Sequence, residues 1–398
     1  MATTETAASR APVVRLIERY LEGALRAGAS DLQFEPSTDS ALRVRMRVDG
    51  ILEDLDTPPM ALVAPLITRL RLAAGVDLAE RRLPQDGRLR LPDWRPKVDI
   101  RAAFLPVCGG ERVALRLLGA KGAQDESVGG GNRTTEGSFA DLGMEAADRA
   151  SLERSISKPN GLVLVVGPTG SGKTTTLYAM VERLRRPDRS LVTVEDPVER
   201  LLAGTAQVEV DENVGRSFAV VLRALLRQDP DVVMVGEMRD TDSARIACRA
   251  ALTGHLVLSS LHTADCRQAL VRMKEMGVAD YLMVNTVTLV IAQRLLRRLC
   301  PHCLKTRRPE RPELELYARA GLEAPDRLAL ARGCAQCSKR GFSGRRAVFE
   351  LLDLDHVAPR RARCKSLLAS ALALAAALET TVGEALARCP MVEPKRHR

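Results

Sequence analysis

With 398 residues, of which 28% are charged and 45% hydrophobic, the chain is long enough for two or three packed domains, and its composition excludes a fibrous or disordered protein. Its formal charge of +10 would suit nucleic acid, but aromatic residues make up only 3%, too few for the stacking surfaces that bind single strands. An arginine-rich surface suits acidic proteins, anionic lipid headgroups or nucleotide phosphates equally well.

No apolar run reaches the roughly 18 residues of a membrane span, and the longest one, residues 366–378, is rich in alanine. The first residues have no basic start followed by an apolar stretch, so we expect no secretory signal. These features predict a cytoplasmic protein with reduced cysteines, and they leave a peripheral position on a membrane open.

The first 118 residues alternate short helical and strand patterns. Residues 13–26 have helical apolar spacing, whereas residues 42–48 and 98–103 alternate apolar and polar side chains as strands do. We therefore expect a small α+β domain over residues 1–118. Glycine and polar residues dominate 119–138, which predicts a flexible linker.

Four apolar runs follow the linker, each bounded by turn residues and separated by helical stretches. This pattern is typical of strands that are covered on both faces of a parallel sheet. We expect residues 139–299 to form an α/β core of this kind. The runs cover residues 162–166, 191–194, 232–235 and 256–260.

A glycine-rich segment lies directly after the first run and before a helical stretch. It matches the pattern G-x-x-x-x-G-K-[ST] in full, the loop whose backbone N–H groups surround phosphates at the start of a helix. A chance glycine-rich turn would lack this context of strand, loop and helix. We expect Lys173 to contact the β and γ phosphates of ATP and the Thr174 hydroxyl to ligate Mg²⁺. The predicted nucleotide-binding residues are Gly167, Pro168, Thr169, Gly170, Ser171, Gly172, Lys173, Thr174 and Thr175.

Carboxylates and histidines flank the other core runs. Glu195 and Glu237 follow the second and third runs, at the edge where open sheets bind ligands, and could orient water or hold Mg²⁺. A single acid at a strand end is more often a helix cap, but two of them beside a phosphate loop favour function. His255 and His262 stand at the two ends of the fourth run, where an imidazole can donate and accept hydrogen bonds. A lone histidine is usually structural, so function is favoured only modestly here.

Four further patterns stand in order along the chain: GPTGSGKTTTLY, TVEDPVE, RQDPDVVMVGEMRD and TGHLVLSSLHT. They resemble, in the family's order, the Walker A, aspartate box, Walker B and histidine box of the secretion ATPases of type II secretion and type IV pilus assembly, the general secretory pathway E type. ASDLQFEP, LRVRMRVDG and QDGRLR extend the similarity to about residues 25–354. The resemblance implies a RecA-like core with Glu195 as catalytic base, Glu237 assisting at Mg²⁺ and water, and His255 and His262 sensing phosphate.

The same resemblance maps Arg88, Arg101 and Arg112 of the N-terminal domain onto arginines that close over the nucleotide and stabilise charge on the γ phosphate. It implies a homo-hexamer in which the N-terminal domain moves on the linker as ATP turns over. The implied partners are the cytoplasmic domain of an inner-membrane secretion platform protein and an acidic phospholipid surface. No nucleic acid is expected.

Four cysteines form two CxxC pairs separated by thirty residues: Cys300 with Cys303, and Cys334 with Cys337. Four thiolates suit tetrahedral Zn²⁺, and a closed set leaves no position for a catalytic water, so we expect structural zinc in a subdomain over residues 300–345. The alternative is a chance pairing of reduced core cysteines. Beyond it the family pattern fades, and residues 346–398 are expected to form a divergent helical tail.

The predicted function is an ATP-hydrolysing cytoplasmic motor, peripherally associated with the inner membrane, that powers pseudopilus assembly and protein export in type II secretion. A type IV pilus assembly ATPase is the alternative. A nucleic-acid-dependent P-loop motor is a more distant one. A nucleotide-binding regulator without hydrolysis is disfavoured because Lys173, Thr174, Glu195 and Glu237 are all present.

Overall fold

The structure, a computed structural model, describes residues 12–37, 41–91, 98–118, 139, 142–354 and 365–390. The chain divides into two compact units, Met1–Asn132 and Arg133–Arg398. The linker expected at 119–138 and the last eight residues of the expected tail lie outside the described part. Within the described ranges, no helix combines the length and apolar character needed to cross a bilayer.

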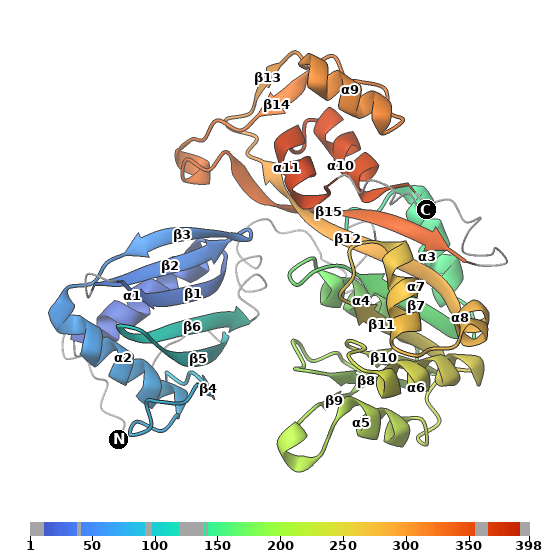
Figure 1. Ribbon diagram of the computed structural model, residues 1–398, viewed down its shortest axis with the longest axis horizontal. Coiled ribbons are helices and arrows are strands. Elements are labelled where there is room, and N and C mark those ends of the chain that lie inside the picture. The colour runs from blue at the N-terminus through green and yellow to red at the C-terminus, as the bar shows by residue number, and fades with distance from the viewer. Residues whose placement is uncertain are drawn as a thin grey trace. The chain divides into compact units, whose positions relative to one another are not determined.

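In its described residues, the N-terminal unit forms a six-stranded antiparallel sheet with two helices (Figure 1). The strand order is β3-β2-β1-β6-β5-β4, and side chains from both helices join those of the strands in one core. The predicted helix at 13–26 and strand at 42–48 are confirmed. In chain order the elements are α1 (Pro12–Arg26), β1 (Ala29–Pro36), β2 (Leu42–Val48), β3 (Ile51–Asp56), α2 (Met60–Ala74), β4 (Gln85–Arg88), β5 (Asp99–Val107) and β6 (Gly110–Leu118).

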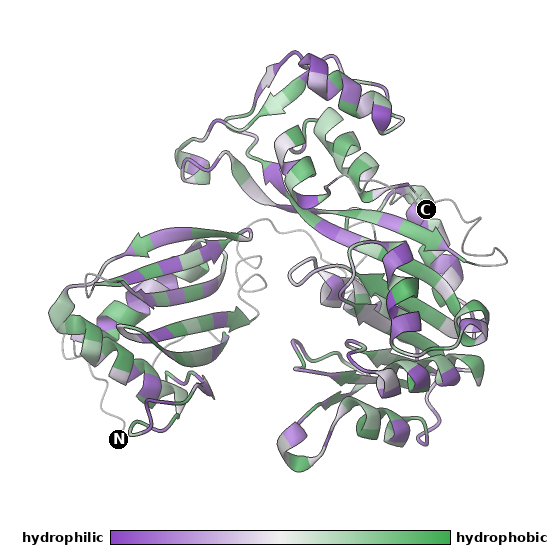
Figure 2. Ribbon diagram, viewed as in Figure 1, coloured by the Kyte–Doolittle hydropathy of each residue, from purple (hydrophilic) through white to green (hydrophobic). Residues whose placement is uncertain are grey.

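Burial alternates along the strands of this sheet. On β5, Ile100, Ala102 and Phe104 are buried against the helices, whereas Arg101 lies on the opposite face. Figure 2 shows the same alternation as hydrophilic and hydrophobic bands along β1, β2 and β6. One face of the sheet is therefore core and the other carries charge.

The second unit contains a seven-stranded sheet in the order β15-β12-β7-β11-β10-β8-β9 (Figure 1). All neighbouring strands run parallel except β12 and β15. The first part of the unit contains α3 (Ala146–Ile156), β7 (Gly161–Val166), α4 (Lys173–Leu184), β8 (Leu191–Glu195), β9 (Ala206–Glu209), α5 (Phe218–Leu225), β10 (Val232–Val235), α6 (Thr241–Leu252), β11 (Leu256–Leu261), α7 (Cys266–Glu275), α8 (Asp280–Thr286) and β12 (Val287–Leu299).

The four predicted core strands are confirmed as β7, β8, β10 and β11, and every residue in them is buried. Two hydrophobic cores cover the two faces of the sheet. One core includes side chains of α3 and α4, and the other includes side chains of α5, α6, α7 and α8. Because both faces are covered, polar chemistry is confined to the edge where the strands end. The expected α/β fold with a parallel sheet is thus confirmed.

The C-terminal part contributes both to the sheet and to its cover. Its elements are β13 (Lys305–Arg307), α9 (Arg311–Arg319), β14 (Leu328–Leu330), the short 3₁₀ helix η2 (Ala335–Cys337), β15 (Phe342–Asp353), α10 (Leu367–Ala376) and α11 (Val382–Arg388). β15 crosses the boundary expected at residue 345 and pairs with β12 as an edge strand of the core sheet. The described tail after it forms two helices, one of which is tied to β12 by Glu384 and Arg297 at 2.6 Å.

Candidate active site

The predicted phosphate loop connects β7 to α4, at the edge of the sheet where the parallel strands end. Gly167 and Gly172 both have positive φ, 155° and 90°. A Cβ on Gly167 would lie 2.7 Å from the carbonyl oxygen of Gln293, and one on Gly172 would lie 2.8 Å from Gln293 Nε2. Only glycine therefore allows this backbone to curl so closely against β12.

Lys173, the first residue of α4, points back into the loop. Its Nζ donates to the carbonyl oxygens of Gly167 at 2.9 Å and Pro168 at 3.2 Å. Burial lowers the pKa of the Lys173 ammonium; the negative charge of Glu237 raises it and the positive charge of Arg294 lowers it further. An ammonium held over loop carbonyls at the start of a helix is a phosphate-binding arrangement.

The remaining side chains of the loop fit a phosphate ligand as well. The Ser171 hydroxyl is buried, and among the described residues it has no hydrogen-bond partner. Pro168, Thr169 and Gly170 are exposed at the tip of the loop, and Thr174 is half-buried at the start of α4. The loop thus offers unused donors toward the space that it encloses.

Glu237 lies two residues after β10 and is the centre of a charged cluster. Its Oε1 accepts from Arg239 Nε, and its Oε2 accepts from His262 Nε2 at 2.9 Å. Arg239 also donates to Asp196 Oδ2 at 2.7 Å. Although burial acts in the opposite direction, these two carboxylates raise the pKa of Arg239. The cluster therefore holds the Glu237 carboxylate in a fixed orientation, within electrostatic range of Lys173.

Glu195, the last residue of β8, is buried and fixed by three donors. Its carboxylate accepts from Thr193 Oγ1 at 2.6 Å, from Gln207 Nε2 at 3.0 Å and from the Tyr178 hydroxyl. Burial, followed by the bond to Glu195 and its charge, raises the pKa of Tyr178. Three bonds occupy three of about four acceptor positions of a carboxylate, so one position remains for water or substrate.

The two predicted histidines lie at opposite ends of β11. Because β7 and β11 run parallel, His262 follows the end where the phosphate loop begins. His255 precedes the other end, roughly 20 Å away at about 3.3 Å per residue, and its Nδ1 lies 3.0 Å from the carbonyl oxygen of Ala250 at the C-terminal end of α6. The structure brings His262 to the Glu237 cluster and leaves His255 outside it.

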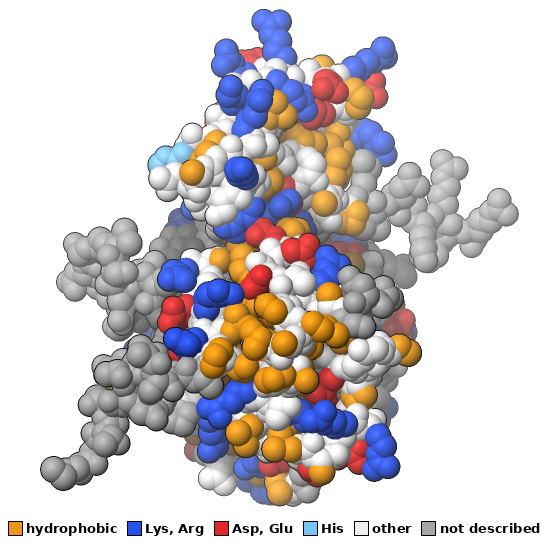
Figure 3. Space-filling view, turned by 90° about the vertical axis from the view of Figure 1, so that its left-hand side faces the viewer, with side chains coloured by type: hydrophobic (Ala, Val, Ile, Leu, Met, Phe, Trp, Pro, Cys, Tyr) orange, Lys and Arg blue, Asp and Glu red, His pale blue; other side chains and the backbone are white. Residues whose placement is uncertain are grey.

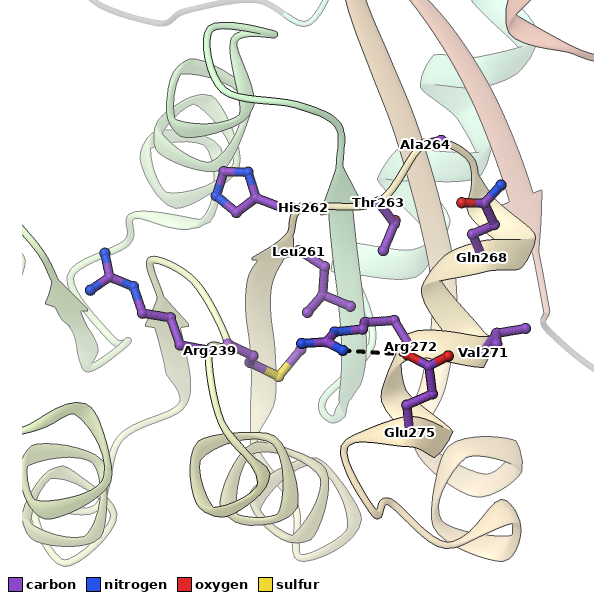
Figure 4. A pocket seen from close by; sticks show the side chains of 10 residues that line it. Arg239, Leu261, His262, Thr263, Ala264, Gln268, Val271, Arg272 and Glu275 are labelled. Atoms are coloured by element: carbon purple, nitrogen blue, oxygen red, sulfur yellow. Dashed lines mark hydrogen bonds and ion pairs between the residues drawn. The ribbon is translucent and has the colours of Figure 1, made fainter. Parts of the chain in front are cut away.

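A hollow of about 540 Å³ lies beside this cluster, between the end of β11, the turn after β10 and α7 (Figure 4). Arg239 and His262 belong both to the hollow and to the Glu237 cluster, whereas the phosphate loop is not part of its lining. The lining residues are Met238, Arg239, Leu261, His262, Thr263, Ala264, Gln268, Val271, Arg272 and Glu275. The hollow therefore adjoins the Glu237 cluster and is separate from the phosphate loop.

The three predicted arginines of the N-terminal unit lie on the charged face of its sheet. Arg88 pairs with Asp99 at 2.6 Å, and Arg112 pairs with Glu35 at 2.8 Å. Arg101 of β5 lies directly opposite Arg88 of β4. The Asp99 carboxylate, two residues before Arg101 on β5, lies beside these two positive charges and offsets their repulsion.

The four paired cysteines form a cluster with metal-site geometry. Their Sγ atoms all lie within 4.8 Å of one another, and the Cys300–Cys334 and Cys303–Cys337 separations are 3.9 and 3.8 Å. Sulfurs bound at about 2.3 Å to one tetrahedral zinc lie roughly 3.8 Å apart, whereas disulfide sulfurs lie about 2.0 Å apart. Against burial, which acts in the opposite direction, the backbone N–H groups of Cys334 and Gly341 lower the pKa of Cys337 to about 6. The geometry of the cluster fits a tetrahedral metal ion.

Sequence reasoning missed several residues that complete these contacts. Tyr178 and Arg239 lie inside the segments GPTGSGKTTTLY and RQDPDVVMVGEMRD, so those motifs already contained the signal. Gln293 and Arg294 lie on β12 without any motif, and Thr176 Oγ1 donates to Gln293 Oε1 at 2.7 Å across 117 positions of sequence. Only the folded chain reveals that contact.

Comparison with known proteins agrees with this geometry. A family model described as "Type II/IV secretion system protein" matches residues 6–380. "Type II secretion system protein E" of Pseudomonas aeruginosa is 45% identical over 345 residues, which cover 87% of this chain and 66% of that protein. "Type IV pilus assembly ATPase PilB" of Myxococcus xanthus is 41% identical over 352 residues, which cover 87% and 59%.

A solved structure extends the similarity to three dimensions. The crystal structure of the pilus retraction motor PilT with bound ADP has a TM-score of 0.53 and 28% identity to this chain, and covers 72% of this chain and 80% of its own. The chain spans about two thirds of the length of the curated relatives that it matches. The matched family model covers more than half of the chain, from before α1 to the end of α10. This chain belongs to the type II/IV secretion system protein family.

Proposed function

We propose that this chain is an ATPase that powers pseudopilus assembly and protein export in a type II secretion system. The observation that carries the proposal is the pairing of Glu237 with His262 at 2.9 Å, in the electrostatic field of Lys173. A phosphate-binding ammonium, a carboxylate and an imidazole at one sheet edge are what hydrolysis of a terminal phosphate requires. The relatives named as secretion and pilus assembly proteins supply the biological context.

Each group then has a defined task. Lys173 and the loop amides bind the β and γ phosphates, and Thr174 would hold Mg²⁺, which neutralises phosphate charge when bound. Glu195, with its one remaining acceptor position, takes the proton of the attacking water. Glu237 orients that water, and His262 links Glu237 to the γ phosphate. His255 is assigned a structural role at the end of α6.

We infer that the active assembly is a homo-hexamer in which arginines of the N-terminal unit complete the site. The position of Arg88, Arg101 and Arg112 on one face of the N-terminal sheet supports this, because guanidinium groups can bind phosphate oxygens. The N-terminal unit also exposes hydrophobic side chains, among them Met60 and Leu72 of α2, and hydrophobic side chains gather on the face that Figure 3 shows. Exposed apolar patches of this kind are typical of surfaces that a partner covers.

The proposed location is the cytoplasmic face of the inner membrane, beside the cytoplasmic domain of a secretion platform protein. The net charge of +10 supports attraction to an acidic phospholipid surface. Turnover of the purified chain should rise when that domain and vesicles containing anionic lipid are added together. Stimulation by DNA at physiological salt, without such a response, would instead support a nucleic-acid motor.

We propose that the cysteine cluster holds structural zinc. Replacing Cys300 with Ser should reduce the bound zinc, measured by metal analysis, and lower the unfolding temperature, because a closed thiolate site contributes directly to folding. Cys108, which is exposed in the N-terminal unit, provides the matched control. Equal zinc content in the Cys300→Ser and Cys108→Ser variants would exclude this metal site.

The decisive experiment compares ATP turnover of the wild type with two variants. Lys173→Ala should lose both nucleotide affinity and turnover, whereas Glu195→Gln should keep nucleotide affinity and lose about 10² to 10⁴ in kcat. Unchanged affinity and turnover in the lysine variant would end the motor proposal. Turnover that survives in the glutamine variant would transfer the role of base to another group.

The pilus assembly alternative rests on the 41% identity to the Myxococcus relative. Secretion and pilus assembly can be separated by complementation. The chain should restore export in a strain that lacks protein E of type II secretion, and should leave a strain that lacks PilB without pili. The reverse result would favour the pilus assembly ATPase.

A further inference from the structure

One charged side chain beside the phosphate loop has no part in the function proposed above. Arg294 lies on β12, the strand next to β7. Ala292 pairs with Val166, the last residue of β7, so Arg294 lies beyond that pair, level with the start of the loop. A guanidinium in this place is close to the reacting groups without belonging to any of the recognised motifs.

The guanidinium of Arg294 contacts both its own strand beside the loop and the segment that follows β11. Its Nη2 donates to the carbonyl oxygen of Ala264 at 2.6 Å, and its Nη1 donates to the carbonyl oxygen of Gln293 at 2.9 Å. Ala264 lies two residues after His262, in the short connection between β11 and α7. The guanidinium thus joins the phosphate-loop side of the sheet to the connection that carries the histidine.

The charges around Arg294 show that it is held there at a cost. Burial lowers the pKa of Arg294, and the carboxylates of Glu350 and Asp265 oppose this effect. Its own charge also lowers the pKa of Lys173, after the larger effect of burial. A partly desolvated cation beside a second cation needs compensating bonds, and the two carbonyl contacts provide them.

The other end of the connection is anchored independently. The Asp265 carboxylate accepts from the N–H of Gln268 at 2.8 Å and caps α7. Buried Glu350 of β15 accepts from the N–H of Cys266 at 3.2 Å. The start of α7 is therefore fixed without Arg294, and the bond to Ala264 restrains the part of the connection nearer to His262.

We propose that Arg294 is a positioning residue for His262: by holding the Ala264 carbonyl it fixes the connection so that the His262 ring meets the Glu237 carboxylate. The catalytic consequence rests on the proposed ATPase function, whereas the structural part can be tested without turnover. The residue acts through His262 and does not touch the nucleotide.

The first experiment measures how fast diethyl pyrocarbonate modifies His262 in the full chain, followed by peptide mass spectrometry. Arg294→Gln should release the connection, and the rate at His262 should rise several-fold because its Nε2 is freed from Glu237. Arg298→Gln, an exposed arginine on the same strand, is the matched control. Exposed His302 serves as the internal reference. Equal rates at His262 in the two variants overturn the proposal.

The second experiment is a double-mutant cycle with His262→Gln, read as kcat and KM for ATP and the Kd of ADP. Arg294→Gln should lower kcat about tenfold, which corresponds to the loss of one charge-assisted hydrogen bond. KM and Kd should stay within about twofold, and the loss should vanish in the His262→Gln background because both changes remove the same interaction. Additive losses of kcat would show that Arg294 acts independently of His262. A Kd for ADP that rises as kcat falls would show that Arg294 binds phosphate. Either result would overturn the proposal.

This design separates three outcomes: a variant that fails to fold, a failure of the proposed ATPase function, and a failure of the role proposed for Arg294. If Arg294→Gln does not fold, Arg294→Lys keeps the positive charge but replaces the guanidinium fork that reaches two carbonyl oxygens with a single ammonium nitrogen. It should show the same effects at smaller size. A wild type that neither binds nor hydrolyses ATP would defeat the proposed function and leave the modification rates to decide on Arg294. A wild type that hydrolyses ATP, with an unaffected Arg294→Gln variant, would defeat only the role of Arg294.

Discussion

The two sheets of the molecule place their charges in different ways. In the N-terminal sheet, charged side chains lie along one face and pair across strands, as Asp31 does with Arg116 at 3.2 Å and Arg43 with Asp54 at 2.9 Å. In the second sheet, the four central strands β7, β8, β10 and β11 are buried throughout, and in these four strands charge appears only where they end. Charge is thus a solvated covering in one sheet and a concentrated site in the other.

This difference predicts unequal costs of substitution. Exposed ion pairs contribute about 0–1 kcal/mol each because water and salt screen them. Groups at the edge of a covered sheet interact in a partly desolvated environment, where a positioned carboxylate or imidazole is worth far more. The five predictions below test where this contrast holds and where a buried charge in the N-terminal unit departs from it.

The largest effect is expected at the edge of the second sheet. Glu237→Gln removes the charge that holds Arg239 and His262 while keeping the shape of the side chain. Steady-state kinetics should show a fall in kcat of about 10² to 10⁴, with KM for ATP changed little. Glu182→Gln on the body of α4, where the carboxylate pairs with Arg200, should leave kcat near wild type. Similar losses of kcat in both variants would show that a carboxylate at the strand ends contributes no more to turnover than one on the body of α4.

The second effect is expected in the N-terminal unit, where one arginine is fully buried and should therefore cost far more to replace than the exposed ones. Arg71 of α2 pairs with Glu111, donates to the carbonyl oxygen of Glu80 at 2.5 Å and lies over the Phe104 ring. Arg71→Met keeps an unbranched apolar stem but removes the guanidinium and leaves Glu111 unpaired. The free energy of unfolding of this unit should fall by about 3–5 kcal/mol.

Hydrogen exchange of the β5 and β6 amides measures that loss within the unit itself. Protection should drop in Arg71→Met and stay unchanged in Arg69→Met, a half-buried arginine of the same helix. If both variants keep wild-type protection, the buried ion pair is dispensable.

The sequence predicted most of the edge of the second sheet because its signals are local. The loop from Gly167 to Thr174 follows a motif, and the strands beside it are continuous apolar runs. That His255 lies far from His262 could also have been predicted, because parallel strands place only their carboxyl ends at the site. The positions of His255 and His262 at the two ends of one apolar run did not by themselves distinguish their roles.

What could not be predicted depends on contacts between distant segments. β12 is a run of 13 residues with three arginines, which fits neither a strand nor a helix by periodicity alone. Its pairing with β15 and the contact of Gln293 with Thr176 arise only when the sheet assembles. For the same reason β15 could not be separated from the helical tail that follows it.

The third prediction concerns Tyr178, whose hydroxyl donates to Glu195 and accepts from the N–H of Glu199 at 3.2 Å. Tyr178→Phe should lower kcat about tenfold and leave KM unchanged, because a hydrogen bond to a charged group is worth about 1.5–3 kcal/mol. Tyr281→Phe, on an exposed tyrosine of α8, is the control and should have no effect. An equal kcat in both variants would remove Tyr178 from the site.

The same residue predicts a dependence of stability on pH. Burial and the bond to Glu195 raise the pKa of Tyr178 in the folded chain above its unfolded value near 10. Its contribution is therefore complete below about pH 10 and is lost as pH rises toward the folded value. As the pH rises above about 10, the unfolding temperature of the wild type should therefore fall more steeply than that of Tyr178→Phe. Parallel curves for the two proteins would contradict this assignment.

The smallest effect is expected on the charged face of the N-terminal sheet. Arg43 and Asp54 pair at 2.9 Å, but their side chains are 49% and 65% exposed. Arg43→Gln should therefore change the stability of the unit by less than about 1 kcal/mol, measured by hydrogen exchange of the β2 and β3 amides. Raising the salt concentration should weaken exchange protection in the wild type only slightly, and should reduce the difference between the two proteins, because solvent ions screen an exposed pair. A loss as large as that expected for Arg71→Met would show that this face is held by its ion pairs, and the contrast between the two sheets would then lie in their chemistry and not in their energetics.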